Sequence, residues 1–284
     1  MRRPAATVVA VVVAAVLGPV LAGCSGGSDE PSAGATSTSP STTTPSPSAP
    51  PTATVPRPPR ERACYDLTYA EAIAPTTSAR HVSCKDTHTA ATYAVGTVDD
   101  LVDGHLLAVD SDRVQAEVAK TCPEKFARVV GGTEEDRRLS MLRPVWFTPT
   151  VEESDAGADW YRCDAVAIAA DEELAPLTTA VQGALDSEEG RDRYGMCGTA
   201  QPGTAHFERV ICTADHSWRA VAVVPFVGGS YPGVAKVKAA GQTPCQDAGA
   251  AAASDSLDYQ WGYEWPTAEQ WATGQTFGRC WAPD

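Results

Sequence analysis

Two sets of four cysteines, each set surrounded by the same residues in the same order, constrain this chain more than any other feature. Residues 82–95 match residues 210–223 at an offset of 128, through a shared Val-x-Cys-x-x-x-His pattern followed by Ala-Val. Residues 149–163 match residues 266–280 at an offset of 117 without a gap. An ordered match of rare residue types over this length predicts that the folded part is an internal duplication.

The cysteines also predict disulfide bonds, because eight of the 9 Cys lie in the folded part and an even number is typical of exported proteins. A duplication leaves three possible pairings for the four cysteines of each half. Of these we favour first with second and third with fourth, which gives Cys64–Cys84, Cys122–Cys163, Cys197–Cys212 and Cys245–Cys280. No Cys-x-x-Cys is present, which excludes thioredoxin-like redox chemistry and the usual zinc-knuckle spacings.

Both halves show the same order of predicted elements. Segments rich in valine, alanine and aromatic residues predict strands, and these are residues 91–98, 142–147, 160–168 and 218–227. Residues 110–126 carry apolar side chains on one helical face and predict a helix, with residues 231–245 as its shorter counterpart.

A short capped helix is predicted near the end of each half. Thr150 precedes Glu153 by three residues, and Thr267 precedes Gln270 in the same way, so both pairs fit a capping box. Gly157 and Gly274 follow where such a helix would end. The predicted fold class is therefore α+β, with two tandem homologous disulfide-stapled domains. Each is a small, mainly antiparallel sheet with one longer and one short helix.

The segment between the two halves carries leucine and valine at helical spacing. Residues 171–187 place Leu174, Leu177, Val181 and Leu185 on one face and predict an amphipathic connecting helix. The chain is accordingly divided into a signal peptide, a tether, domain 1, a connecting helix and domain 2, at residues 1–23, 24–62, 63–170, 171–194 and 195–284.

The N-terminus predicts export and lipid anchoring. Two arginines precede an apolar run over residues 5–21, as in a signal peptide. The run ends in Leu21-Ala22-Gly23-Cys24, which resembles the lipobox of bacterial lipoproteins. That resemblance implies cleavage before Cys24, a diacylglycerol thioether on its sulfur, and a location on the outer face of the cell membrane. An uncleaved signal anchor or a plainly secreted protein is the alternative.

Composition excludes several other classes. Residues 25–60 are almost wholly Ser, Thr, Pro, Ala and Gly, which predicts a disordered tether of roughly 30–36 Å as a coil. The net charge of −14 argues against nucleic-acid binding and against electrostatic docking on anionic lipid. Only the N-terminal run approaches the length of a membrane span, so a polytopic membrane protein is excluded.

The pattern of the second half resembles the septum formation domain of actinobacterial envelope proteins. The residues that carry this resemblance are Val210-x-Cys212-x-x-x-His216, Tyr231-Pro232-Gly233, Cys245, Pro266-Thr267-x-x-x-Trp271-x-x-Gly274 and Cys280. The first half matches more loosely, because it lacks the Tyr-Pro-Gly and has Ser154 in place of the tryptophan. The resemblance implies an extracytoplasmic role in cell division or envelope assembly, and it brings no catalytic residues with it.

His88 and His216 are the polar residues of the two halves that are best suited to a chemical role. A histidine in this setting is suited to a general base or a metal ligand, or to a structural hydrogen bond beside the cysteine loop. Recurrence in both halves favours the structural role, since two identical active sites on divergent repeats are uncommon. We therefore expect no metal and no cofactor.

A row of aromatic residues is the candidate binding surface. Tyr259, Trp261, Tyr263 and Trp265 alternate along the chain and share one face if they form a strand. An exposed face of this kind stacks on sugars or receives a peptide, whereas a buried one forms the core of domain 2.

The sequence as a whole favours a protein that is not an enzyme. It predicts a lipid-anchored extracytoplasmic binding or scaffold protein linked to septum formation or envelope assembly. Its expected partners are the membrane, through the anchor, and envelope or division proteins or cell-wall polymer, but not nucleic acid. Two alternatives remain: an exported hydrolase that uses His88 or His216, and a ligand or carbohydrate sensor that uses the aromatic row.

Overall fold

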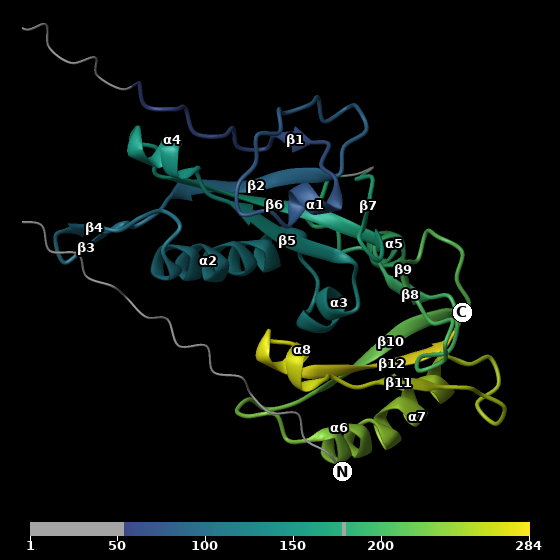
Figure 1. The fold of residues 1–284 in the computed structure, drawn as a ribbon. Coiled ribbons are helices and arrows are strands. Elements are labelled where there is room, and N and C mark those ends of the chain that lie inside the picture. Colours follow the sequence, from purple (N-terminus) through teal and green to yellow (C-terminus); the bar gives the residue numbers. More distant parts are fainter. Residues whose placement is uncertain (1–53, 178–179) are drawn as a thin grey trace, which may run out of the picture. The chain divides into compact units, whose positions relative to one another are not determined.

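Two five-stranded antiparallel sheets organise the part of the chain that a computed structural model describes, residues 54–177 and 180–284 (Figure 1). The predicted signal peptide, Cys24 and most of the tether lie outside the described residues. The first sheet has the order β1-β2-β6-β5, with β7 paired to β6, and the second has the order β11-β12-β10-β8-β9.

The strands of the first sheet are β1 (Cys64–Tyr65), β2 (Ala90–Thr97), β5 (Leu142–Phe147), β6 (Trp160–Ala170) and β7 (Glu173–Ala175). Those of the second sheet are β8 (Met196–Gly198), β9 (Arg209–Ile211), β10 (Trp218–Pro225), β11 (Gly262–Glu264) and β12 (Phe277–Pro283). A small separate hairpin is formed by β3 (Leu101–Val102) and β4 (His105–Leu106).

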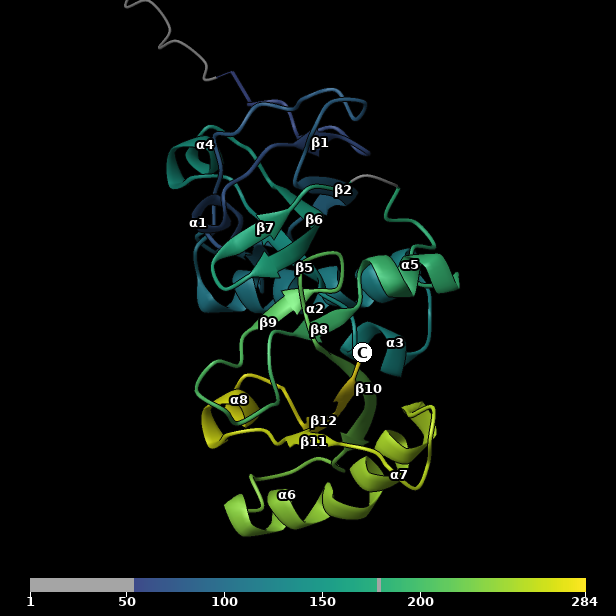
Figure 2. The same cartoon turned by 90° about the vertical axis from the view of Figure 1, so that its right-hand side faces the viewer.

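Helices cover both sheets, as the two views in Figures 1 and 2 show: α2 lies against the first sheet, and α6 and α7 run along the second. The helices are α1 (Tyr69–Ala72), α2 (Asp112–Val130), α3 (Glu134–Arg138), α4 (Val151–Asp155), α5 (Glu188–Arg193), α6 (Val234–Ala240), α7 (Gln242–Ala252) and α8 (Ala268–Ala272). Among the described residues, no helix combines the length and apolarity needed to cross a bilayer.

Helix α2 forms because every fourth residue along one face is apolar. Val114, Val118, Cys122, Phe126 and Val130 are all buried. The helix runs four residues beyond the predicted end and contains Pro123, whose missing N–H costs one backbone hydrogen bond. Burial of the apolar face outweighs that loss.

The two sheets share the same strand register at their disulfides. In the first sheet Cys163 on β6 pairs with Ala94 on β2, and in the second Cys280 on β12 pairs with Ala222 on β10. Both strand pairs shift register just before this point, between Thr92 and Ala94 in one case and between Ala220 and Ala222 in the other. The outer neighbours agree as well, with Trp146 opposite Cys163 and Tyr263 opposite Cys280.

Four disulfides fasten the sheets, and they are the pairings favoured from the sequence. In each half one bridge closes the loop that precedes a central strand, β2 or β10, and the other ties helix α2 or α7 to the neighbouring central strand, β6 or β12. They are Cys64–Cys84, Cys122–Cys163, Cys197–Cys212 and Cys245–Cys280. Removing such a bridge from a small exported domain costs about 2–5 kcal/mol.

Both predicted capping boxes are present. The Thr150 hydroxyl accepts from the backbone N–H of Glu153 at 3.2 Å, and the Glu153 carboxylate accepts from the Thr150 N–H at 3.0 Å. Thr267 and Gln270 repeat this arrangement at 3.2 and 2.9 Å. Gly157 and Gly274 each follow with φ of +97°, a conformation that an L side chain rarely adopts.

The predicted connecting helix over residues 171–187 is wrong for the described residues. That segment begins with strand β7 and continues in turns, and among its described residues up to residue 194 the one helix is α5. Its backbone bonds go to other segments: the N–H of Leu177 donates to the His88 carbonyl, and that of Leu185 donates to the Val130 carbonyl. Pro176 and Gly183, the latter at φ of +67°, oppose a helix there.

The helix expected over residues 231–245 is two helices instead. Helix α6 begins only at Val234, and Gly241 separates it from α7, which continues to Ala252. A side chain at residue 241 would run into the ring of Tyr263, because an added Cβ would lie 2.2 Å from that ring. The break therefore allows the helix pair to approach strand β11 closely.

One hydrophobic cluster joins the two sheets. It contains Leu142 from the first sheet, Trp281 from the second, and Leu177, Val181 and Leu185 from the segment between them. The backbone contributes too, because the N–H of Met141 donates to the Tyr194 carbonyl and the N–H of Met196 donates to the Leu139 carbonyl. Residues 52–284 thus form one compact unit.

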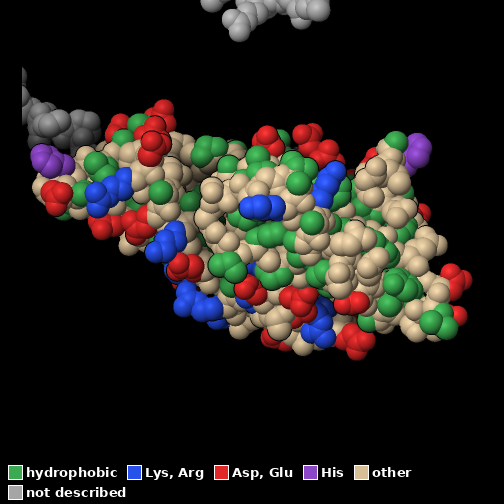
Figure 3. Space-filling view, turned by 90° about the horizontal axis from the view of Figure 1, so that it is seen from below, with side chains coloured by type: hydrophobic (Ala, Val, Ile, Leu, Met, Phe, Trp, Pro, Cys, Tyr) green, Lys and Arg blue, Asp and Glu red, His purple; other side chains and the backbone are tan. Residues whose placement is uncertain are grey.

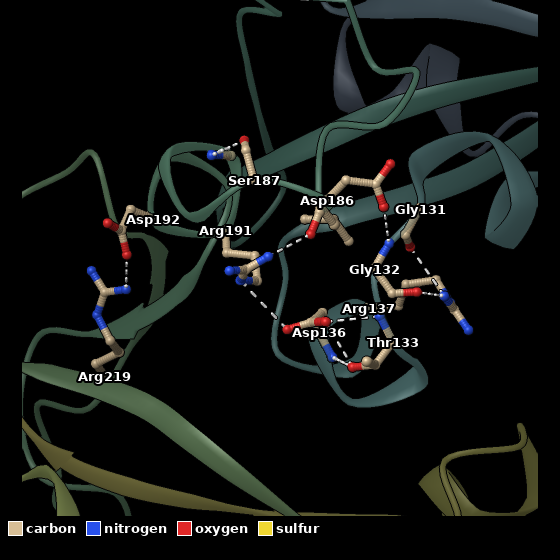
Figure 4. Close-up of polar contacts among 12 residues, drawn as sticks. Gly131, Gly132, Thr133, Asp136, Arg137, Asp186, Ser187, Arg191, Asp192 and Arg219 are labelled. Atoms are coloured by element: carbon tan, nitrogen blue, oxygen red, sulfur yellow. Dashed lines mark hydrogen bonds and ion pairs between the residues drawn. The ribbon is translucent and has the colours of Figure 1, made fainter.

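Helix α5 adds polar bonds to both halves, as Figure 4 shows. Asp192 of this helix pairs with Arg219 on β10 at 2.9 Å. The preceding residue, Arg191, lies 3.7 Å from the Asp136 carboxylate on α3 and donates to the Leu185 carbonyl at 2.9 Å. Each exposed pair contributes less than about 1 kcal/mol, so these bonds set orientation more than stability.

A buried ion pair lies inside the first sheet. The Arg162 guanidinium is 2.8 Å from the Asp164 carboxylate, and both side chains are almost fully buried. Arg162 stacks over the rings of Tyr65 and Phe147 at 3.8 and 4.4 Å, and Asp164 accepts from the Thr92 hydroxyl at 2.7 Å. Burial raises the pKa of Asp164 above its usual value, and the charge of Arg162 opposes that rise.

The shared cluster predicts that the two sheets unfold together. Leu185 is fully buried in it, so Leu185→Ala should lower the free energy of unfolding by about 2–5 kcal/mol while leaving one cooperative transition. Urea unfolding followed by tryptophan fluorescence and by far-UV circular dichroism measures both quantities. Leu257→Ala, at a side chain that is 94% exposed, is the control and should change stability by less than about 0.5 kcal/mol. Two separate transitions in the wild-type protein would contradict a shared core.

The buried ion pair predicts a stability loss that depends on pH. Arg162→Met leaves the Asp164 carboxylate buried without its partner and should cost about 3–5 kcal/mol at pH 7. A carboxyl whose pKa is higher in the folded than in the unfolded chain loses stability as pH rises above its unfolded pKa, so the loss should shrink toward pH 4. Urea unfolding at both pH values tests this, with Arg113→Met on the exposed side of α2 as the control. An equal loss at both pH values would show that Asp164 does not carry the effect.

Candidate functional site

The two predicted histidines occupy equivalent structural positions. The Nδ1 atom of His88 lies 2.8 Å from the carbonyl oxygen of Asp86, and that of His216 lies 2.7 Å from the carbonyl of Ala214. In both cases the partner is the backbone two residues earlier, and a carbonyl oxygen only accepts. Nδ1 therefore carries the hydrogen in both rings and serves to close the cysteine loop.

His216 has a second polar partner. Its Nε2 atom lies 3.0 Å from the carboxylate of Asp284, which also accepts from Arg219 at 2.8 Å. Arg219 and His216 hold the pKa of Asp284 below its usual value, against the effect of its partial burial. Both ring nitrogens of His216 thus lie beside oxygen acceptors, and neither is free to take a proton from a substrate.

Cys197 lies beside this pair, and its sulfur is within 4.8 Å of the ligating atoms of His216 and Asp284. The sulfur is bonded to that of Cys212, so it is not the thiolate that a zinc ion requires. The cluster lacks the donor set of a metal site.

The aromatic row lies against helices α6 and α7. Tyr263 donates from its hydroxyl to the Val237 carbonyl at 3.0 Å, and burial raises its pKa to about 12. Trp265 lies beside Tyr263 and under the ammonium of Lys238, which is 4.3 Å from its ring centre. Trp261 packs against the cluster around the Cys245–Cys280 bridge. Only residues 262–264 are in a strand, so the row extends beyond the β11 ladder.

None of the four aromatic side chains, Tyr259, Trp261, Tyr263 and Trp265, is fully exposed. All four are half-buried, so they form neither a fully buried core nor an open sugar-stacking surface. On the face of the protein that Figure 3 shows, basic and acidic side chains are interspersed and do not gather into a continuous basic patch.

A cavity of about 620 Å³ lies between the two sheets, and no prediction from the sequence pointed to it. Arg143 at the start of β5, Arg209 at the start of β9 and Arg279 on β12 line it together with Gln275. The other lining side chains are mostly apolar, and among them are Met141, Val166, Ile168, Leu174, Met196 and Phe207. Acidic residues of the lining, Asp171, Glu172 and Glu208, are exposed.

The three arginines differ in their partners. Arg209 forms a close ion pair with Glu264, and Arg279 lies 3.8 Å from the same carboxylate. Arg143 donates to the backbone carbonyls of Ser140 and Leu142 at 2.8 and 2.7 Å, and no described carboxylate lies within ion-pair distance of it. Among the described residues, Glu264 is therefore the one carboxylate within ion-pair distance of these three guanidinium groups, and the three acidic residues of the lining are exposed.

Burial and the neighbouring positive charges lower the pKa values of two of these arginines. Burial and the charge of Arg209 lower the pKa of Arg143 to about 10. Burial and the charges of Arg143, Arg209 and Arg138 lower the pKa of Arg279 to about 9. Arg143 and Arg279 both remain cations at neutral pH, but the surroundings of each guanidinium group disfavour its charge.

One sequence signal for this site was present. Arg162 and Arg279 stand at matching positions of two similar segments, directly before the cysteines of β6 and β12. The match by itself does not indicate what either arginine binds. Arg143 and Arg209 lie outside the matching segments, so nothing in the sequence pattern linked them to Arg279.

Comparison with protein-family models identifies the family of this chain. Residues 63–280 match a single model, described as Septum formation, and the match runs across both sheets. No curated protein and no solved structure matches the chain. The matched residues make up well over half of the sequence and include both cysteine sets and both histidines. The chain belongs to the Septum formation family.

Proposed function

We propose that this protein is a lipid-anchored, extracytoplasmic binding or scaffold protein that acts in septum formation or envelope assembly without catalysing a reaction. The observation that carries the proposal is the family match over residues 63–280. The eight paired cysteines add support, because disulfides of this kind form in oxidising compartments outside the cytoplasm.

The anchor in this proposal is Cys24. The lipobox resemblance at residues 21–24 and the Ser/Thr/Pro-rich residues 25–60 support a folded body tethered to the outer face of the membrane. Two acyl chains are enough for stable anchoring, since each buried CH₂ contributes about 0.8 kcal/mol. The partners we propose are envelope or division proteins or cell-wall polymer, and the net charge of −14 argues against nucleic acid.

The roles of the histidines support a non-catalytic protein. His88 and His216 each use Nδ1 in a hydrogen bond to the backbone of their own loop, and His216 is paired with Asp284 as well. A general base needs a free ring nitrogen within hydrogen-bond reach of the proton it removes. Nε2 of His216 is occupied by Asp284, so the exported-hydrolase alternative is less well supported at that residue.

We further propose that the two sheets descend from one duplicated unit. The support is the shared register at Cys163 and Cys280, the common bulge two residues before their partners, and the matching order of bridges and caps. Domain boundaries at residues 63–170 and 195–284 follow from this proposal, with the remaining residues as a connector that packs into the shared core.

The anchor predicts where the protein is found. Cys24→Ala removes the thioether site, so most of the protein should move from the membrane fraction to the soluble fraction. Fractionation of cells with a carbonate wash, followed by mass spectrometry of the N-terminal peptide, measures this. Ser28→Ala in the tether is the control and should stay with the membrane. A Cys24→Ala protein that remains in the washed membranes would indicate an uncleaved signal anchor.

The structural role of the histidines predicts that function survives their replacement. Asparagine can keep an N–H donor near the Nδ1 position, whereas it cannot act as a general base near neutral pH. A strain lacking the gene should show a septum or envelope defect, and the double variant His88→Asn/His216→Asn should restore at least half of wild-type complementation. Protein levels are measured alongside, because loss of folding is a separate outcome. Abolished function in a stable, correctly located double variant would favour catalysis.

A further inference from the structure

The cavity between the sheets has the size and lining of a small-molecule site. Its volume of about 620 Å³ falls within the range of roughly 300–1,000 Å³ that is typical of ligand pockets. Val166, Ile168 and Met196 belong to its apolar part, and Arg143, Arg209 and Arg279 supply its charged groups. A pocket built in this way suits a ligand that is apolar at one end and anionic at the other.

The charge balance indicates the sign of the ligand. One carboxylate, that of Glu264, is shared between Arg209 and Arg279, and Arg143 is bonded only to backbone carbonyls. Asp171, Glu172 and Glu208 lie on exposed parts of the lining, where water screens their charges. Like charges in a partly buried site repel one another, and a bound anion would relieve that repulsion.

Comparison with the first sheet shows that the matching arginine there is fully enclosed and has a carboxylate of its own. Arg162 occupies the matching position on β6, and there the guanidinium is enclosed between Tyr65 and Phe147 and paired with Asp164. Arg279 on β12 is equally buried, at 5% exposure, but it lines an open cavity. The same position thus serves the core in one sheet and faces a cavity in the other.

We propose that this cavity binds a small amphiphilic anion, with a carboxylate or phosphate group held by Arg143 and Arg279 and an apolar portion against Val166, Ile168 and Met196. Arginine suits this role because its planar fork donates two parallel hydrogen bonds to either group. The inference goes beyond the proposed function and does not depend on the lipid anchor or on a role at the septum.

The test is isothermal titration of the full exported chain, with its disulfides formed, in phosphate-free buffer. The probes are hexyl phosphate, hexanoate, inorganic phosphate, and hexanol as the uncharged match. Hexyl phosphate or hexanoate should bind at least tenfold more tightly than hexanol and than inorganic phosphate. Whichever of hexyl phosphate and hexanoate binds more tightly indicates whether the ligand carries a phosphate or a carboxylate group. Raising the salt concentration to 0.5 M should weaken binding of the charged probes.

Variants test whether the carboxylate or phosphate group is bound by the arginines. Arg143→Gln should weaken binding of the preferred anion at least tenfold, Arg143→Lys should weaken it less because the charge remains, and Arg113→Gln on α2 should leave it unchanged. Arg143→Lys also serves where the glutamine variant fails to fold. The proposal is overturned if neither anion binds at 1 mM, if hexanol binds as tightly as the anions, or if folded Arg143→Gln binds as wild type does.

Discussion

The hydrophobic cluster shared by the two sheets is the interaction on which the rest of the structure depends. Neither sheet alone covers the side chains that enter it, because Leu142 comes from one sheet, Trp281 from the other and Leu185 from the chain between them. The paired backbone of residues 139–141 and 194–196 fixes how the sheets meet. That junction also creates the arginine-lined cavity, whose walls come from both sheets.

Features that depend on a few neighbouring residues could be predicted from the sequence. The Thr150 and Thr267 capping boxes, the glycines that follow them and the central strands are of this kind, because each rests on short-range geometry. The predicted duplication limited each set of four cysteines to three pairings, and the favoured pairing is the one present in the structure. The connecting segment shows the limit: its apolar spacing correctly marked Leu177, Val181 and Leu185 as buried, but the spacing alone does not distinguish a helix from turns.

The arginine-lined cavity could not be predicted, because it depends on where distant segments meet. Arg143, Arg209 and Arg279 are separated by long stretches of chain, and each looks like an ordinary surface arginine in its own segment. The matching position is no guide either, because Arg162 is a core residue paired with Asp164 whereas Arg279 lines the cavity. The alternation of the aromatic row allowed both a surface and a core, and its side chains are half-buried, with Tyr263 and Trp265 in contact with helix α6.

The position of the cavity has a consequence for how binding would act on the protein. Arg143 belongs to the first sheet and Arg279 to the second, so an anion held by both would tie the sheets together. A ligand that binds only the folded state adds stability that grows with the logarithm of its concentration. Two arginines that are held in surroundings unfavourable to their charge raise the energy of the empty protein, and the same two groups make the filled protein more stable. Binding of such an anion would therefore stabilise the contact between the two sheets through the same side chains.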